Sequence, residues 1–192
     1  MIVGLTGGMG SGKSVVAKIF ETLGCAVFNS DHVAKEIYFD PTIRLQIIKL
    51  LGEESYLPES LLNKTFISAK IFNNSFLLQA LNNIIHPAVS VAFKNFITKN
   101  SDKVVVKESA LLFEAKAEEQ VDKIVLVVAD EQLRLKRIIN RDKLTEQEIR
   151  SKIRSQWSQE EKIKRSDFVI FNNEAEFLTP QVINVLKEIK YA

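Results

Sequence analysis

This chain of 192 residues has little cysteine and proline, with one cysteine and four prolines, and its net charge is small, at +2. Because Cys25 is alone, no internal disulfide can form, as is typical of a reducing compartment, and its apolar neighbours favour a packing role. The near balance of 26 basic and 24 acidic residues creates no field that would indicate nucleic-acid binding.

Long apolar runs are also lacking, since none approaches the roughly 20 residues that span a bilayer. A strand-like segment begins at residue 2, so we expect no signal peptide before it. At this length the chain forms one domain, or a core with an inserted lobe. These features predict a cytoplasmic globular protein with no membrane or nucleic-acid partner.

Four of the seven glycines lie between Gly7 and Ser14, where the chain reads Gly-Gly-Met-Gly-Ser-Gly-Lys-Ser. This segment matches the phosphate-binding pattern G-x-x-x-x-G-K-[ST], in which glycines let successive backbone N–H groups turn toward phosphate oxygens. Lys13 would supply a charge for the β- and γ-phosphates, and Ser14 would supply a hydroxyl ligand for Mg²⁺.

The surroundings of this segment agree with the pattern, because residues 2–6 are an apolar run of strand type and residues 15–20 continue as a helix. The helix would point its partial positive charge at a bound anion. A chance match has a probability of roughly 1% or less at ordinary residue frequencies. We predict that ATP phosphates are bound by Gly10, Ser11, Gly12, Lys13, Ser14 and Val15.

Short β-branched or aromatic runs recur along the chain and are typical of parallel strands buried on both faces. They alternate with helical segments, which predicts an α/β fold of the three-layer P-loop nucleoside triphosphate hydrolase type with a parallel sheet. We expect a core at about 1–38, 102–130 and 165–192, an inserted helical substrate lobe at about 39–101, and a helical lid at about 131–164.

Two carboxylates follow predicted strands, at the sheet edge where α/β proteins bind their ligands. Asp31 could accept a proton from a substrate hydroxyl or help to hold Mg²⁺, and the alternative is a helix N-cap. Glu108 is a second candidate for the site, whereas Glu114 is more typical of a local cap or ion pair.

Three arginines, Arg134, Arg137 and Arg141, are spaced three and four residues apart and would project from one side of a helix. Guanidinium groups suit phosphate oxygens, although a solvated helix face would also explain them. Thr145 and Glu148 predict a capping box on the next helix. A helix pair of this kind is typical of a lid that closes over ATP and brings at least one arginine to the phosphates.

One histidine, His86, precedes Pro87, and this pair predicts a helix junction because the residue before a proline avoids helical geometry. A lone histidine at such a place is usually structural. A ligand role for His86 therefore needs support from elsewhere in the sequence.

In their order and spacing these residues resemble the dephospho-coenzyme A kinase family over nearly the whole chain. The family opens with Gly-Leu-Thr-Gly-Gly-Ile-Gly-Ser-Gly-Lys-Ser, from which residues 4–14 differ only at Met9. Further matches are Asn-Ser-Asp at 29–31, Ile-Ile-His-Pro at 84–87, Ala-Leu-Leu-Phe-Glu at 110–114, Arg137 with Arg141, and the segment 166–172.

The resemblance implies that ATP phosphorylates the ribose 3′-hydroxyl of dephospho-coenzyme A, the last step of coenzyme A synthesis, with Mg²⁺ as metal. Asp31 would be the base or the metal-organising carboxylate, with Lys13 and Arg141 acting on the phosphates. Arg137 and Asn172 would bind the nucleotide, with Asn172 near the adenine. The expected substrate-binding residues are His86, Glu108 and Lys64.

Several positions depart from the family pattern. Asn29 replaces the first Asp of Asp-Ala-Asp, which concentrates the metal role on Asp31, and Glu108 replaces an Asp. Lys64 stands where the substrate lobe has an arginine, so that it keeps the charge but loses bidentate geometry.

Two alternatives remain open from the sequence. Another nucleoside or nucleotide monophosphate kinase would share the core, lobe and lid, and only its acceptor would differ. A GTPase would typically carry Asn-Lys-x-Asp, but the nearest segment, residues 63–66, lacks the Asp. The oligomeric state is expected to be a monomer or a weak homo-oligomer.

Overall fold

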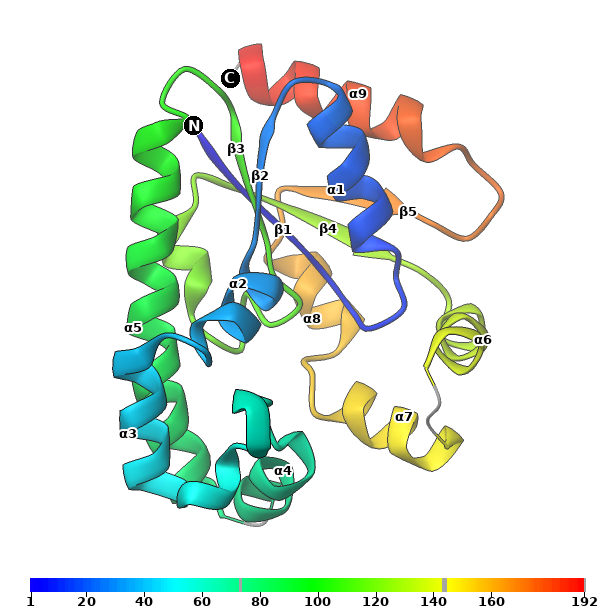
Figure 1. The fold of residues 1–192 in the computed structure, drawn as a ribbon. Helices are drawn as coiled ribbons and strands as arrows, with labels where there is room; N and C mark the ends of the chain where they lie inside the picture. The colour runs from blue at the N-terminus through cyan, green and yellow to red at the C-terminus, as the bar shows by residue number, and fades with distance from the viewer. Residues whose placement is uncertain (73, 143–144, 192) are drawn as a thin grey trace. The chain divides into compact units, whose positions relative to one another are not determined.

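The computed structural model describes residues 1–72, 74–142 and 145–191 (Figure 1). The chain divides into two compact units. We call the first the core unit, which comprises Met1–Asn29 and Asn100–Ala192, and the second the helical unit, which comprises Ser30–Lys99.

A parallel sheet of five strands forms the centre of the core unit, as the alternation of strands and helices predicted. Its strands lie in the spatial order β2-β3-β1-β4-β5. Since β1 lies in the middle, the turn that follows it has a strand on either side. The bounds are β1 (Ile2–Gly7), β2 (Ala26–Asn29), β3 (Val105–Glu108), β4 (Lys123–Val128) and β5 (Phe168–Phe171).

The two faces of the sheet are covered by different elements. Val3 and Leu5 of β1 are fully buried in a cluster with residues of α1 (Lys13–Thr22) and α9 (Leu178–Tyr191), which lie together in Figure 1. Gly4 faces the other side, where a Cβ would approach Leu112 Cδ2 to 2.9 Å. Because both faces are packed, β4 and β5 are largely continuous apolar runs, whereas β3 ends in the buried polar residues Lys107 and Glu108.

The second face also carries η3 (Ala117–Gln120) and a cluster that contains Leu112, Phe113 and Ile124. Phe113 stacks on Trp157 with ring centroids 5.8 Å apart. Cys25 is buried as expected, in the cluster with α1 and α9, and its burial raises the pKa of the thiol.

Three helices follow β4: α6 (Glu131–Arg141), α7 (Glu146–Arg154) and α8 (Gln159–Lys164). Leu135 and Ile138 of α6 form a small apolar cluster with Ile149 of α7. The predicted capping box at Thr145 is confirmed, since its side chain accepts from the Glu148 N–H and its own N–H donates to the Glu148 carboxylate.

The helical unit has its own core, formed by Ile47, Leu51, Tyr56, Ile67, Leu81 and Ile85. Asp40 caps one of its helices by accepting from the N–H groups of Thr42 and Ile43. The elements are α2 (Ser30–Ile37), α3 (Pro41–Leu51), η1 (Glu53–Ser55), η2 (Pro58–Ser60), α4 (Lys64–Phe72) and α5 (Ser75–Lys99). The unit begins at Ser30 rather than near residue 39, because α2 packs against α5. Its role as a substrate lobe stays a prediction.

The expected helix junction at His86 is wrong, because α5 runs without interruption through Pro87. Proline inside a helix costs about 3 kcal/mol. Residues on either side of it, Ile85 and Val89, pack in the same core, and this shared packing offsets the cost.

The helix α5 is apolar over much of its length, but polar residues such as Gln79, Asn82 and Asn83 interrupt it. An 18-residue window within it has a mean hydropathy of 1.3, so by length and composition it is the one candidate span among the described residues. Leu81 and Ile85 of α5 are core residues, and 17% of that window is buried.

Phe20 tests the packing of α1 on the sheet. Its side chain is completely buried, so Phe20→Ala is expected to lower the free energy of unfolding by about 3–5 kcal/mol in chemical denaturation. The matched control is Phe177→Ala, because Phe177 is 86% exposed and its loss should cost less than about 0.5 kcal/mol. Equal effects of the two substitutions would contradict this account of the core.

Candidate active site

The phosphate loop connects the end of β1 to the start of α1, as predicted. Gly12 precedes the helix with φ of +94°, and its carbonyl accepts from the N–H groups of Val15 and Val16. A Cβ on Gly12 would collide with the side-chain amide of Asn172, so a side chain at position 12 is disfavoured both by the positive φ and by this contact.

The side chain of Lys13 extends back over the phosphate loop to its first residues. Its ammonium donates to the carbonyl of Gly7 at 3.0 Å and that of Gly8 at 3.4 Å, and the side chain is buried. Ser14 is exposed at the first turn of α1. The loop therefore holds one positive charge in a fixed place and presents one hydroxyl to solvent.

Two further side chains bind loop carbonyls from outside the loop. The Nε of Arg134, on α6, donates to the carbonyl of Met9 at 2.8 Å, and the amide of Asn172 donates to the carbonyl of Ser11 at 2.8 Å. Burial lowers the pKa of Arg134. The N–H of Met9 donates to Oε1 of Gln156 at 3.0 Å.

The three arginines predicted to act together have different surroundings. Arg137 donates to the carbonyl and side-chain oxygen of Asn172 at 3.1 and 3.3 Å, and its buried Nη1 has no hydrogen-bond partner among the described residues. Arg141 is 63% exposed and binds its neighbour Asp142 at 2.8 and 2.9 Å, which lowers the pKa of that carboxyl. Arg134 is buried whereas Arg141 is mostly exposed, so three arginines of one helix have different surroundings.

Glu108 and Asn29, the two neighbouring positions that depart from the family pattern, contact each other. They are paired in the register of β2 and β3, and the Asn29 amide donates to the Glu108 carboxylate at 2.8 Å. Glu108 is buried. Two carboxylates at this distance would repel each other, and the amide removes that repulsion.

Glu114 pairs with residues far along the chain rather than locally. It lies 2.8 Å from the ammonium of Lys162, which is also buried, and accepts from the N–H of Trp157 at 2.9 Å. These contacts attach the segment between α7 and α8 to the turn after β3. Sequence spacing carries no signal for such a pairing.

The remaining predicted residues belong to the helical unit. Asp31 is exposed in the first turn of α2, which begins at Ser30, so it does not occupy the N-cap position. His86 lies within α5, and Lys64 is the first residue of α4. Their roles stay predictions.

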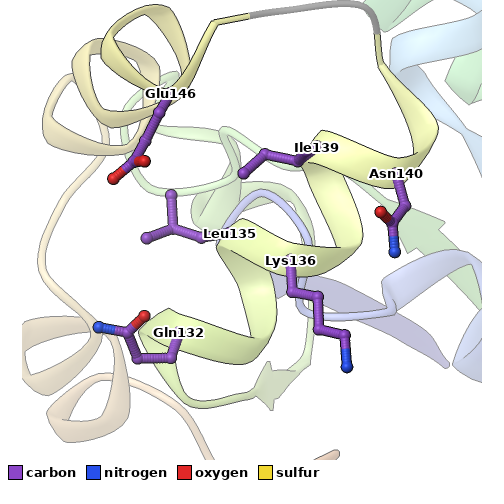
Figure 2. A pocket seen from close by; sticks show the side chains of 6 residues that line it. All are labelled: Gln132, Leu135, Lys136, Ile139, Asn140 and Glu146. Carbon is purple, nitrogen blue, oxygen red and sulfur yellow. The ribbon is translucent and has the colours of Figure 1, made fainter.

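The structure contains a cavity of about 460 Å³ in the core unit, whose lining includes Gly8, Arg134, Gln156 and Trp157. A second hollow of about 260 Å³ is lined by residues of α6 and by Glu146 of α7 (Figure 2). Figure 2 shows Leu135 and Ile139 extending from α6, with Glu146 of α7 across the hollow. No residue of the phosphate loop is among the described residues that line this second hollow.

The family model of dephospho-CoA kinase matches residues 1–177. The chain belongs to this family. Dephospho-CoA kinase from Bacteroides fragilis is 39% identical over 186 residues, which are 96% of this chain and 90% of the relative. The corresponding protein of Geobacillus kaustophilus is 34% identical over 194 residues, covering 98% of this chain and 96% of the relative.

Solved structures agree with the family. A protein from Thermus thermophilus has a TM-score of 0.86 at 27% identity, covering 100% of this chain and 96% of its own. A dephospho-CoA kinase from Campylobacter jejuni has a TM-score of 0.70 at 27% identity, covering 98% and 96%. Shikimate kinase from Acinetobacter baumannii, at 19% identity and a TM-score of 0.52 over 99% and 93%, shares the fold. The chain is therefore a kinase with a P-loop fold.

Gly12 and Gly24 offer a matched test of the loop geometry. Both have positive φ, +94° and +89°, but a Cβ at Gly24 would meet nothing within 4 Å. Gly24→Ala should lower the free energy of unfolding by about 1 kcal/mol through backbone strain and leave ADP binding unchanged. Gly12→Ala should in addition displace Asn172, and it should weaken ADP binding more than tenfold. Calorimetric titration with ADP measures the difference, and equal affinities would contradict it.

Proposed function

We propose that this kinase transfers the γ-phosphoryl group of ATP to the ribose 3′-hydroxyl of dephospho-CoA, which yields CoA and ADP. The observation that carries the proposal is the family match over residues 1–177. The matched part includes a phosphate loop whose carbonyls at Gly7, Met9 and Ser11 accept from protein side chains. The same match favours a cytoplasmic enzyme.

The nucleotide phosphates would be bound by the ammonium of Lys13 and by backbone N–H groups from Gly10 to Val15. Of these, the N–H groups of Ser11 and Val15 also donate to the carbonyls of Gly8 and Gly12. Arg137 has a buried Nη1 available as a donor and contacts Asn172, which would lie near the adenine. Arg141 would have to release Asp142 to reach the phosphates. Positive charge arranged in advance stabilises the transferring phosphoryl group without reorganisation.

Mg²⁺ fits the chemistry of the proposed site. It binds proteins through one or two oxygens while keeping waters and phosphate oxygens as ligands, so no dense carboxylate cluster is required. The described residues contain no group of three or more His, Cys, Asp or Glu that could hold a metal ion. Ser14 and Asp31, both exposed, would be its protein ligands. When bound, it would neutralise charge that develops on the phosphates.

On the acceptor side, Asp31 would orient the 3′-hydroxyl and accept its proton as the new bond to phosphorus forms. Asp31 is exposed and lies in the first turn of α2. His86 and Lys64 of the helical unit would bind the substrate. Glu108, held by Asn29, is the third proposed contact.

An acceptor panel tests the proposal. ADP release would be measured with dephospho-CoA, nucleoside monophosphates and nucleosides, each with and without Mg²⁺. Of the acceptors tested, we expect only dephospho-CoA to support ADP release, and only when Mg²⁺ is present. Lys13→Ala should lower this turnover by orders of magnitude. Preference for a nucleoside monophosphate would overturn the acceptor.

Asp31 provides the sharpest mechanistic prediction. Asp31→Asn should lower turnover at least about a hundredfold, as expected for loss of a general base, with little change in ATP affinity. Glu36→Gln is the matched control, because it removes an exposed carboxylate from the same helix and should leave turnover unchanged. Full turnover in Asp31→Asn would remove Asp31 from the reaction.

A further inference from the structure

The tip of the phosphate loop, at Met9, is held in three ways by the segment 131–157. Its N–H donates to Gln156 at 3.0 Å, and its carbonyl accepts from Arg134 at 2.8 Å. Its side chain packs against the cluster of Leu135, Ile138 and Ile149 between α6 and α7. Both polar groups of one residue are thus satisfied by side chains more than a hundred positions away.

We infer that Arg134 and Gln156 are positioning residues for phosphoryl transfer, which act by holding Met9 so that the loop keeps its phosphate-binding conformation. The inference rests on the proposed function for its kinetic consequences. Neither residue would touch the reacting atoms, because Arg134 binds the carbonyl of Met9 and Gln156 binds its N–H.

Arg134 is suited to this task by its burial. It is 7% exposed, and its guanidinium lies directly against Gly8, where any Cβ would collide with it. A guanidinium that has lost most of its water has to keep its protein hydrogen bonds, because leaving a buried donor unsatisfied costs about 1–3 kcal/mol. Its bond to the Met9 carbonyl is therefore hard to break.

Gln156 is held by the backbone beside it. The N–H of Trp157 donates to Glu114, and that carboxylate pairs with the buried ammonium of Lys162. The Gln156 amide nitrogen also approaches the carbonyl of Ala110 at 3.5 Å. The side chain that binds Met9 therefore extends from backbone that is itself hydrogen-bonded to Glu114.

The surrounding space shows why these two contacts matter. Gly8, Arg134 and Gln156 all line the cavity of about 460 Å³, so this side of the loop is not supported by close packing. Without the two side chains, the Gly8–Met9 segment could move into the cavity. The N–H groups that follow, from Gly10 onward, would then lose their alignment toward the phosphates.

Matched substitutions test the inference. Arg134→Met removes the donor and Gln156→Met removes the acceptor. Methionine matches glutamine in length and keeps the unbranched stem of arginine, although it is two atoms shorter than arginine. Arg154→Met and Gln159→Met are the controls, because these residues line the same cavity and none of their described contacts reaches the loop. We would measure ADP affinity by calorimetry, kcat, the KM for each substrate and the melting temperature.

We expect each test variant to bind ADP about tenfold more weakly, because it loses one hydrogen bond. The KM for ATP should rise, whereas the KM for dephospho-CoA should stay within about twofold of the parent value. Both controls should remain within about twofold of the parent protein in every parameter. If Arg134→Met does not fold, Arg134→Lys replaces it, since it keeps the charge and loses the planar fork.

The double variant Arg134→Met/Gln156→Met separates a shared target from two unrelated effects. Because both residues hold Met9, the double variant should lose ADP affinity by a smaller factor than the product of the two single-variant factors. Parent-like ADP binding, effects equal to those of the controls, or strictly additive losses would each overturn the inference. ADP binding needs no acceptor, so failure of the proposed function would appear separately, as absent turnover with dephospho-CoA.

Discussion

A loop that turns its backbone N–H groups toward an anion must turn its carbonyls toward the protein, where each needs a donor. This constraint explains much of the core unit. The carbonyls of Gly7, Met9 and Ser11 are bound by side chains from α1, from α6 and from the segment after β5. The parallel sheet matters because it brings the ends of β1, β4 and β5 to one edge, from which these donors can reach the loop.

The same edge of the sheet carries polar pairs whose members are separated by long stretches of sequence. Asn29 binds Glu108 across neighbouring strands, and Glu114 binds Lys162 of α8. Breaking a buried charge pair by removing one partner costs about 3–5 kcal/mol, so such pairs fix the segments that carry them. The second pair fixes the backbone from which Gln156 reaches the loop, and it thereby connects the stability of the fold to the geometry of the site.

The family pattern alone would treat each departure in this chain as a separate loss. The structure gives a different account of two of them, because Asn29 and Glu108 form one hydrogen-bonded pair. Met9, the single departure in the phosphate loop, keeps an apolar side chain and packs in the cluster between α6 and α7. Substitutions that keep a contact, rather than an identity, leave the architecture of the family intact.

Local chemistry was sufficient to predict the phosphate loop, the buried strands and the Thr145 capping box, because each depends on residues a few positions apart. It was also sufficient to indicate the family, since the spacing of several motifs is specific. Local rules failed at Pro87, where packing of α5 outweighs the cost of proline, and for Arg134 and Gln156, whose partner Met9 is more than a hundred residues away. Only the tertiary structure decided which side chains satisfy the loop, because that choice depends on how the sheet brings distant segments together.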